Sequence, residues 1–563
     1  MSENAVVSFD QPAEFWAIKA DRAAKRGDYL AALDLWHTAM RKDSSQFSYV
    51  RGAVKALEKL GAYEAAACQI RKSINLFPVS DYGEMVYELG CAYQKLGDKK
   101  RAVDALYAYL SGKPEPAKAQ SAKEMLLDLD ERFTGETESN KRANTLMRQS
   151  GASFFRGDNA RMNERLSRAL ISVHGKRRAE ILSMLAMCHL GGDRHDEAAA
   201  CALAALRLKR GDVRASCVLA CVYASRGRFS LSALVMRIAA EGELRSGGEA
   251  ENSLYRRFKP DEETLFCETC ASLSLSEIVR LLYAKKLEDN PYSLTALYRL
   301  GAAQLNLEMY GDAESSFYRY LRLLPSDGLV SRLRSLAQKR EPVAVTFTRT
   351  LPSELIAREV LPPVLQALRG AETPSPFLSD AALAEDARIL IRDTKFSVSL
   401  LSMIEGIGAE AEKKLLLPLL ADEEVPMSVK YSVMLRLYTS GVKPPFLCVS
   451  KTAVSLTQMT KRMSAPAASP FEAQTFRILL SMLPAKGGRG SLALREIMTV
   501  LRPTIRRHPP LSGATPQMYA EALMCRRNSK HVPRVTPNAL LDLISDDMDE
   551  VCGRVNDKDT FWL

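Results

Sequence analysis

Small and apolar residues return at a constant spacing along the N-terminal part of the chain. One set is Trp16, Ala20, Gly27, Tyr29, Ala32, Trp36 and Ala39, and the set 34 residues later is Val50, Val54, Gly61, Tyr63, Ala66, Ile70 and Ser73. A fixed period of this length is typical of an array of helix pairs. Because one pair cannot bury its own apolar face, neighbouring pairs must stack. The pattern therefore predicts a helical solenoid over about residues 13–337.

The third unit shows why these positions carry these residue types. Its first helix carries Val86, Leu89, Gly90 and Tyr93, its turn carries Gly97, and its second helix carries Ala102, Leu106 and Tyr109 before Pro114. Small residues let two helices approach closely, and large residues one turn away fill the remaining space. Proline cannot continue a helix, so we expect Pro114 to end the unit.

Later units keep parts of the pattern. The fifth unit holds Ala186, Ala198, Ala202 and Ala205, the sixth holds Leu219, Tyr223, Gly227 and Ser232, and the last holds Leu297, Leu300, Gly301, Tyr310, Ala313, Phe317 and Tyr320. We expect units 1–3 at 13–115, an extra helix and polar linker at 116–141, units 4–6 at 142–242, a loop and linker at 243–276, and a degenerate and a final unit at 277–337. The extra helix interrupts the strict period.

The region at 341–563 follows a different pattern. Prolines separate helical runs, among them 409–420 and 428–439, and Val429, Val433 and Leu437 share one helix face. Alternating strand patterns are few, so we expect this region to be α-helical as well. The two runs faintly resemble a HEAT-type helix pair.

The repeat positions resemble the tetratricopeptide repeat (TPR) family over about residues 13–337. The resemblance implies an all-α fold, a right-handed solenoid whose concave groove binds peptides or protein partners. In that family the first helix of each unit lines the groove, which implies the candidates Arg51, Lys55, Glu84, Tyr87, Arg214 and Tyr298. Family members that clamp chaperone carboxylates use Lys and Asn where this chain has Ala17 and Asp21. Arg51 and Lys55, one turn apart, either hold an acidic partner or are solvated groove charges.

Composition places the chain among ordinary folded proteins, with 47% apolar and 26% charged residues. Eleven cysteines occur singly, mostly inside apolar helical stretches, which is typical of reduced core thiols. The N-terminal stretch carries two acids and no apolar run, unlike a signal peptide, and no long uncharged apolar stretch suggests a membrane span. We therefore expect a cytoplasmic protein that does not enter a membrane.

The net charge of +11 is unevenly distributed. Residues 443–534 hold fifteen Lys and Arg against three acids, whereas residues 542–559 hold seven acids against two cations. Such a basic block can attract polyanions. An alternative function is therefore nucleic-acid association, with phosphate contacts from Arg502, Arg506, Arg507, Arg526, Arg527 and Lys530. Three short helices expected within 517–556 could form a degenerate helix-turn-helix, but the third holds Asp549 and Glu550, which phosphates would repel.

Motifs for chemistry are incomplete. Cys267 and Cys270 form half of a zinc or redox motif without a second pair close in sequence, and His195 lies in an expected turn. Glycines at 487–490 precede Ser491, but the Lys-Ser/Thr ending of a phosphate-binding loop is missing. We therefore expect no enzyme activity, no cofactor and no metal. The sequence favours a protein-interaction scaffold, with nucleic-acid association as the alternative.

Overall fold

The structure is a computed structural model, which divides into two compact units. It describes residues 11–77, 79–111, 114–129, 159–171, 175–245, 258, 260–369, 375–392, 394–404, 407–426, 429–430, 433–434, 436–437, 440, 442, 446–450, 453–456, 471–472, 474–475, 478 and 515–521. The first unit comprises Met1–Gln69 and Glu138–Leu415, and the second comprises Ile70–Thr137 and Leu416–Leu563. The division falls inside two helices, α4 (Tyr63–Ser73) and α24 (Ala409–Ala421).

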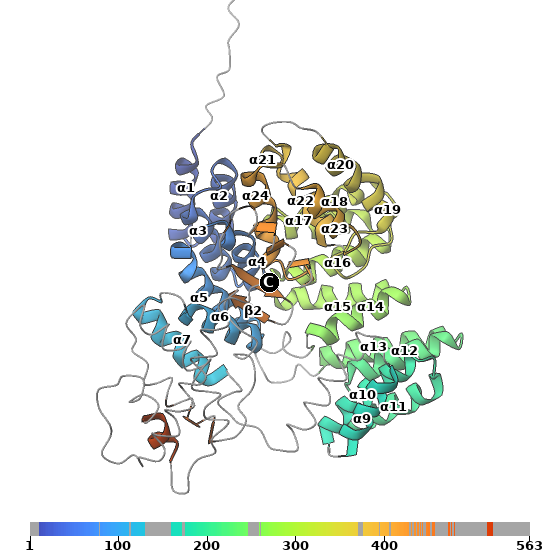
Figure 1. The fold of residues 1–563 in the computed structure, drawn as a ribbon. Coiled ribbons are helices and arrows are strands. Elements are labelled where there is room, and N and C mark those ends of the chain that lie inside the picture. Colours follow the sequence, from blue (N-terminus) through green and yellow to red (C-terminus); the bar gives the residue numbers. More distant parts are fainter. Residues whose placement is uncertain are drawn as a thin grey trace, which may run out of the picture. The chain divides into compact units, whose positions relative to one another are not determined.

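The described elements of the first unit are all helical (Figure 1). Besides parts of α4 and α24 it contains α1 (Ala13–Lys25), α2 (Tyr29–Lys42), α3 (Phe47–Lys59), α9 (Asn159–Ile171), α10 (Gly175–Leu190), α11 (His195–Leu208), α12 (Val213–Ser225), α13 (Phe229–Arg245), α14 (Pro260–Ser272), α15 (Ser276–Asp289), α16 (Leu294–Asn306), α17 (Tyr310–Leu323) and α18 (Gly328–Lys339). Beyond the repeats lie α19 (Ser353–Leu355), the π-helical turn η4 (Ile356–Val360), α20 (Leu361–Arg369), α21 (Pro376–Ser379), α22 (Ala381–Arg392) and α23 (Thr394–Met403).

The second unit combines helices with one small hairpin. It contains η1 (Ile74–Leu76), α5 (Val79–Lys95), α6 (Lys99–Ser111), α7 (Pro116–Leu129), β1 (Leu447–Ser450) and β2 (Ala453–Leu456). The strands pair antiparallel, with Leu447 opposite Leu456 and Ser450 opposite Ala453, and β2 packs against α6. The fold is an all-α solenoid of TPR type, as the sequence predicts. Within the described residues this hairpin departs from the helical interpretation of 341–563.

Every described helix pair turns in the same way. One residue in the left-handed region follows the first helix of each pair, namely Gly27, Gly61, Gly97, Asp193, Gly227, Ser274 and Glu308. In the first pair the N–H of Gly27 bonds to the carbonyl of Ala24 at 3.0 Å, and the N–H of Asp28 bonds to that of Ala23 at 3.1 Å. These two bonds form a Schellman motif, which satisfies the carbonyls at the end of the helix. The same bonds recur at the other six turns.

Three of these turns lack the glycine that marks the others. Asp193, Ser274 and Glu308 adopt positive φ angles of 55–59°. The turn at Ser274 joins α14 to α15, and α14 lies within 243–276, which the sequence analysis interprets as a loop and linker. Because serine gives no turn signal, that helix pair is not visible from the glycine spacing.

In two helix pairs a glycine of the first helix lies beneath a large side chain of the second. A methyl group added at Gly301 of α16 would lie 2.6 Å from the ring of Phe317 on α17. At Gly90 of α5 it would lie 3.0 Å from Leu106 of α6. Glycine therefore sets how closely the two helices approach, and the facing aromatic or leucine fills the space.

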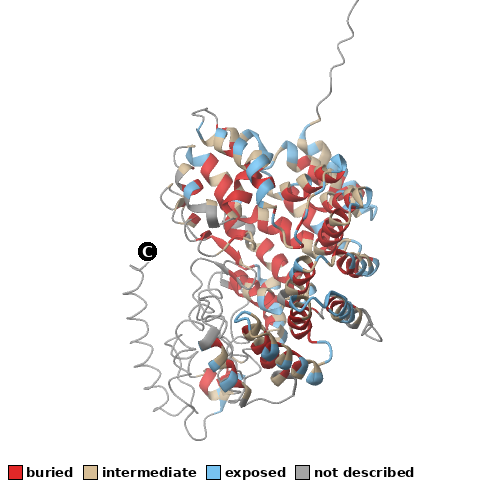
Figure 2. Cartoon of the chain, turned by 90° about the vertical axis from the view of Figure 1, so that its right-hand side faces the viewer, coloured by how far each residue is buried: buried red, intermediate tan, exposed pale blue. Residues whose placement is uncertain are grey.

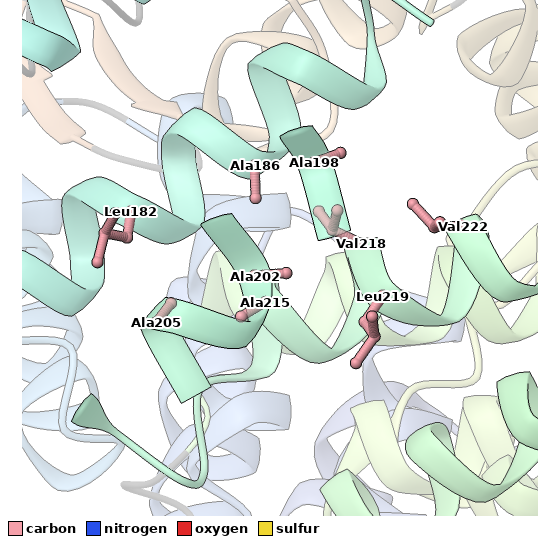
Figure 3. Packing of buried hydrophobic residues seen from close by; sticks show 9 residues of the cluster. All are labelled: Leu182, Ala186, Ala198, Ala202, Ala205, Ala215, Val218, Leu219 and Val222. Atoms are coloured by element: carbon pink, nitrogen blue, oxygen red, sulfur yellow. The ribbon is translucent and has the colours of Figure 1, made fainter. Parts of the chain in front are cut away.

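Alanine has the same function between neighbouring pairs. The cluster across α10, α11 and α12 consists of nine buried residues, five of them alanine (Figure 3). Ala198, Ala202 and Ala205 of α11 share this cluster with Leu182 and Ala186 of α10 and with Val218 and Leu219 of α12. Figure 2 shows the result: buried residues follow the sides of helices that face neighbours, and exposed residues follow the outer sides.

Two polar contacts join distant parts of the first unit. The Glu64 carboxylate of α4 accepts hydrogen bonds from the Thr295 N–H at 2.7 Å and the Ser293 hydroxyl at 3.1 Å. It therefore caps the N-terminus of α16, where a negative charge is favoured by the unpaired N–H groups. Asp34 of α2 pairs with Arg322 of α17 at 2.6 Å. The first two helix pairs are thus tied to the last one.

Among the helices described, none has the length and apolar character needed to cross a membrane.

We predict that Gly301→Ala destabilises the first unit by about 1–3 kcal/mol, because its methyl group would overlap the Phe317 ring. Helix propensity alone would favour alanine by about 1 kcal/mol. Gly311→Ala in α17 is the matched control, since nothing lies within 4 Å of its added methyl group. Urea denaturation measures both, and equal stabilisation by the two substitutions would show that the close approach is absent.

A second prediction concerns His37 of α2, which is 6% exposed and has no hydrogen-bond partner for either ring nitrogen. Burial, together with the charge of Arg41, lowers the pKa of His37 to about 4 from 6.5. The unfolded chain therefore binds a proton that the folded chain excludes, and stability falls as pH drops from 6.5 towards 4. The loss at pH 5 is about 2 kcal/mol.

His37→Leu should remove this part of the pH dependence while other titrating groups remain. The measurement is urea denaturation of both proteins at pH 7 and pH 5. Parallel losses of stability in the two proteins would mean that His37 is protonated in the folded state.

Candidate functional site

The candidate site is the set of first-helix surfaces that the sequence analysis assigns to a groove. In the second unit, α5 carries two of these residues, and both contact α7. Glu84 pairs with Lys118, and the Tyr87 hydroxyl donates to the Ser121 hydroxyl at 3.1 Å. Both pairs are 34 residues apart, so α7 keeps the repeat spacing and takes the place of a next first helix. The sequence analysis did not expect this of the extra helix.

In the first unit, Arg214 of α12 lies 3.9 Å from the carboxylate of Glu262 on α14. Arg51 of α3 is half-buried, whereas Lys55, one turn later, is exposed. Lys59 is exposed one turn further along the same helix. The three cations therefore form one row along α3. We call this row of Arg51, Lys55 and Lys59 the α3 ridge.

Tyr298 of α16 is 2% exposed, because residues of the same chain cover it. Its hydroxyl donates to the carbonyls of Thr346 at 3.2 Å and Thr348 at 2.9 Å. These acceptors belong to residues 342–351, an irregular stretch that follows α18 and that we call the strap. The sequence analysis assigned Tyr298 to the groove. Tyr298 is not accessible to a partner there, because the strap covers it.

Asn306 lies two turns after Tyr298 on α16, and its side chain bonds to the backbone of the strap. Its amide nitrogen donates to the Val345 carbonyl at 2.8 Å, and its amide oxygen accepts from the Val345 N–H at 2.7 Å. The side chain thus pairs with both backbone groups of one residue, as a neighbouring strand would. Val345 and Phe347 are buried, and Thr346 between them is exposed. The alternation is that of an extended chain with one face buried.

The end of the strap is held by charge. Arg349 pairs with Asp327, the N-cap of α18, and Asp327 also accepts from the Tyr320 hydroxyl at 2.9 Å. Asp327 is 1% exposed, so its carboxylate is desolvated and needs these partners. Apolar burial, backbone pairing and an ion pair therefore hold the strap on the repeats.

A buried ionic cluster joins α14, α15 and α16. The Glu263 carboxylate lies 2.9 Å from Arg299 and 3.1 Å from Lys286, and accepts from the Tyr283 hydroxyl at 2.7 Å. Burial alone would raise the pKa of Glu263, but Arg299 and Lys286 lower it to about 2. The carboxylate is therefore charged at neutral pH and links three successive helices.

The cysteine pair belongs to this cluster. The Cys267 thiol lies 3.2 Å from the Tyr283 hydroxyl, and both Cys267 and Cys270 are fully buried. Burial raises the pKa of both thiols, which keeps them protonated and unreactive. In the part of the chain that the structure describes, no three His, Cys, Asp or Glu side chains are placed to hold a metal ion.

A second clamp of the same kind lies in the second unit. Asn75 donates to the Leu447 carbonyl at 2.9 Å and accepts from the Leu447 N–H at 2.9 Å. Asp104 of α6 accepts from the Val454 N–H at 3.2 Å, and buried Lys430 donates to the Val449 carbonyl. Side chains thus satisfy outward backbone groups of both strands of the hairpin, which protects edges that would otherwise be unpaired.

A charged cluster accompanies this hairpin. Glu423 pairs with Arg71 at 3.0 Å and with Arg101, and Arg101 also pairs with Asp98 at 2.6 Å. Burial would raise the pKa of Glu423, but the two arginines lower it below its usual range. The residues of both Asn clamps and both ionic clusters give no sequence signal, because their partners lie far away along the chain.

The basic candidates Arg502, Arg506, Arg507, Arg526, Arg527 and Lys530 lie outside the described residues, as do the glycines at 487–490 and the acidic stretch 542–559. The nucleic-acid alternative therefore stays a prediction from charge alone.

We predict that Asn306→Ala releases the strap, because the Val345 N–H and C=O lose their partners at a cost of about 1–3 kcal/mol each. Limited trypsin digestion should then cut after Arg349 faster than in the wild type, as mass spectrometry can measure. Asn290→Ala is the control, since the Asn290 side chain bonds only locally to the Tyr292 N–H. Unchanged cleavage after Arg349 would contradict the clamp.

Comparison with known proteins agrees with this architecture. The family model described as tetratricopeptide repeat matches residues 83–115, which contain α6 and most of α5. No curated protein matches the sequence.

Several solved structures of helical repeats are similar to this chain. The TPR domain of P58(IPK) is 18% identical, over 58% of this chain and 98% of that chain, with a TM-score of 0.23. The TPR2AB domain of yeast Sti1 in complex with pHSP90 is 16% identical over 45% and 96%, with a TM-score of 0.20. Naa15/Naa10 bound to HypK-THB is 12% identical over 77% and 84%, with a TM-score of 0.24.

The assignment does not depend on these low-scoring superpositions. It rests on the matched repeat and on seven described helix pairs that share one turn geometry. The chain therefore contains a tetratricopeptide repeat at residues 83–115, within a series of helix pairs that share its turn geometry.

Proposed function

We propose that this chain is a protein-interaction scaffold that binds an acidic segment of a protein partner at the α3 ridge. The ridge of Arg51, Lys55 and Lys59 carries the proposal. Spaced one turn apart, these cations match carboxylates repeated along a bound segment.

Three further features support this position. First, α1 packs against α3 and exposes Ile18, which is 53% exposed, so an apolar contact is available next to the cations. Second, Lys55 and Lys59 are exposed, whereas Tyr298 is buried. Third, the strap covers α16. Helices α1 and α3, the first helices of the first two helix pairs, therefore offer the most accessible of the predicted groove positions.

The test is affinity capture from native cell extract with Lys55→Glu/Lys59→Glu and with wild type, each with and without nuclease. We expect protein partners that survive nuclease and bind the variant at least about tenfold more weakly, because attraction becomes repulsion. Lys99→Glu/Lys100→Glu is the matched control, since it reverses two exposed lysines on α6. Nuclease-resistant partners that bind all three proteins equally would contradict the proposal.

Nucleic-acid association is the second candidate, favoured by the concentration of positive charge in residues 443–534. Phosphate binding by several cations weakens steeply as salt rises. If captured partners disappear with nuclease, and if neutralising Arg506, Arg507, Arg526 and Arg527 abolishes a salt-dependent affinity for DNA or RNA, this candidate replaces the first.

A further inference from the structure

The strap shows which kind of segment the face of α16 accepts. Residues at alternate positions of the strap are buried or half-buried, namely Val343, Val345, Phe347 and Arg349. Ala344 and Thr346, by contrast, are exposed. Such alternation is that of an extended chain with one side against a surface. The repeats therefore contact two aliphatic residues, one aromatic residue and one cation, in that order along the strap.

The backbone of the strap is held by side chains of α16. Asn306 bonds to the N–H and the carbonyl of Val345, and the Tyr298 hydroxyl reaches the carbonyls of Thr346 and Thr348. Ala302 lies between Tyr298 and Asn306 on the same row of the helix, where its small side chain leaves room for a backbone. Bonds to a backbone do not depend on the identity of the side chains, so another extended segment can form them.

The Asn306 amide is also positioned by the repeats themselves. Its nitrogen lies 3.4 Å from the Ser276 hydroxyl at the start of α15. The side chain therefore has a contact outside the strap that orients it towards a bound backbone.

A buried carboxylate selects the charge of the segment. Asp327 is 1% exposed, and it accepts from the Tyr320 hydroxyl and from the Val330 N–H at 3.3 Å as the cap of α18. Arg349 brings a positive charge to it from the strap. A segment that replaces the strap without a cation would leave this desolvated carboxylate without Arg349, which costs free energy. A segment that ends in arginine or lysine is therefore favoured.

We propose that Tyr298, Ala302, Asn306 and Asp327, which we call the strap site, bind an extended segment of a protein partner. The segment carries apolar residues at alternate positions and an arginine or lysine two residues after the last of them. The strap holds the site until the partner displaces it. Since the partner segment forms the same kinds of contact, it has to overcome the effective concentration of the tethered strap, which is in the millimolar range.

The strap site is independent of the proposed α3 ridge. The α3 ridge is positively charged and is proposed to bind an acidic segment, whereas the strap site presents a carboxylate to a basic one. One site can therefore fail while the other stands.

The probe is the fluorescein-labelled peptide Ile-Ser-Ile-Ser-Phe-Ser-Lys, which keeps the chemistry of the strap but not its sequence. Fluorescence anisotropy compares full-length wild type with Val345→Ser/Phe347→Ser, in which the strap loses its buried apolar side chains and the strap site is unchanged. The variant should bind with a Kd of about 10–100 μM, as expected for a short peptide. Wild type should bind at least about tenfold more weakly, because its strap competes.

Matched peptides test the alternation and the charge. In Ser-Ile-Ser-Ile-Ser-Phe-Lys the composition is the same, but the apolar residues and the cation no longer share one side of an extended chain. A third peptide has glutamate in place of lysine. Both should bind the strap variant at least about tenfold more weakly than the probe does.

Substitutions in the repeats locate the binding. Asn306→Ala, added to the strap variant, should weaken the probe by about tenfold or more, because two backbone bonds are lost. Asn290→Ala is the matched control and should leave the affinity unchanged, since its side chain bonds only to the Tyr292 N–H. Lys55→Glu/Lys59→Glu should also leave it unchanged, which separates the strap site from the α3 ridge.

A second strap variant guards against misfolding. Arg349→Glu keeps the apolar residues of the strap but places two carboxylates together at Asp327, so it should also bind the probe more tightly than wild type. Circular dichroism and thermal melting check that both strap variants fold.

Three results would overturn the proposal: no binding of the probe to either strap variant, equal binding of the probe and the shifted peptide, or wild-type affinity equal to that of the strap variants. A concentration-dependent dimer of wild type that Val345→Ser/Phe347→Ser dissociates would assign the site to the strap of a second copy instead.

Discussion

The close approach of paired helices is the constraint on which the rest of the structure depends. At Gly301 and Gly90 the first helix has no side chain of its own, so the Phe317 ring and the Leu106 side chain of the second helix pack directly on its backbone. Such a pair is thin and still apolar on its outer sides, so it is stable only when another pair covers it. The stacking of pairs, the alanine-rich cluster in Figure 3 and the shared Schellman turn all keep the helices close together. Leu231, Leu234 and Ile238 of α13 form an apolar side that stacking does not cover.

Segments of the chain itself cover part of the repeat surface. The strap lies on α16, and the hairpin lies on α6, each held by an asparagine that pairs with one residue's backbone. Buried carboxylates with depressed pKa values, Glu263 and Glu423, tie the supporting helices together. These residues stabilise the fold, and the proposed α3 ridge lies apart from them.

The sequence was sufficient where the signal was local and periodic. Spacing predicted stacked helix pairs, because small residues must recur where helices touch. It could not locate α14, whose turn uses Ser274 in place of glycine, nor the hairpin, whose four-residue strands are too short for a clear alternation. Tyr298 was assigned to a groove face, but it is buried by a segment about fifty residues away along the chain. The Cys267–Cys270 pair has the spacing of a metal motif, and the structure places the Cys267 thiol against Tyr283 of the buried ionic cluster, a contact that the spacing does not predict.

The most direct test of the claim that the chain occupies its own repeat surface is hydrogen exchange at the Val345 amide. This N–H lies outside regular secondary structure and bonds to the Asn306 side chain at 2.7 Å. If the strap is bound as described, the Val345 amide exchanges slowly, on the timescale of buried amides in α16. Exchange at the rate of an unstructured peptide would show that the strap is free and that α16 is open to a partner.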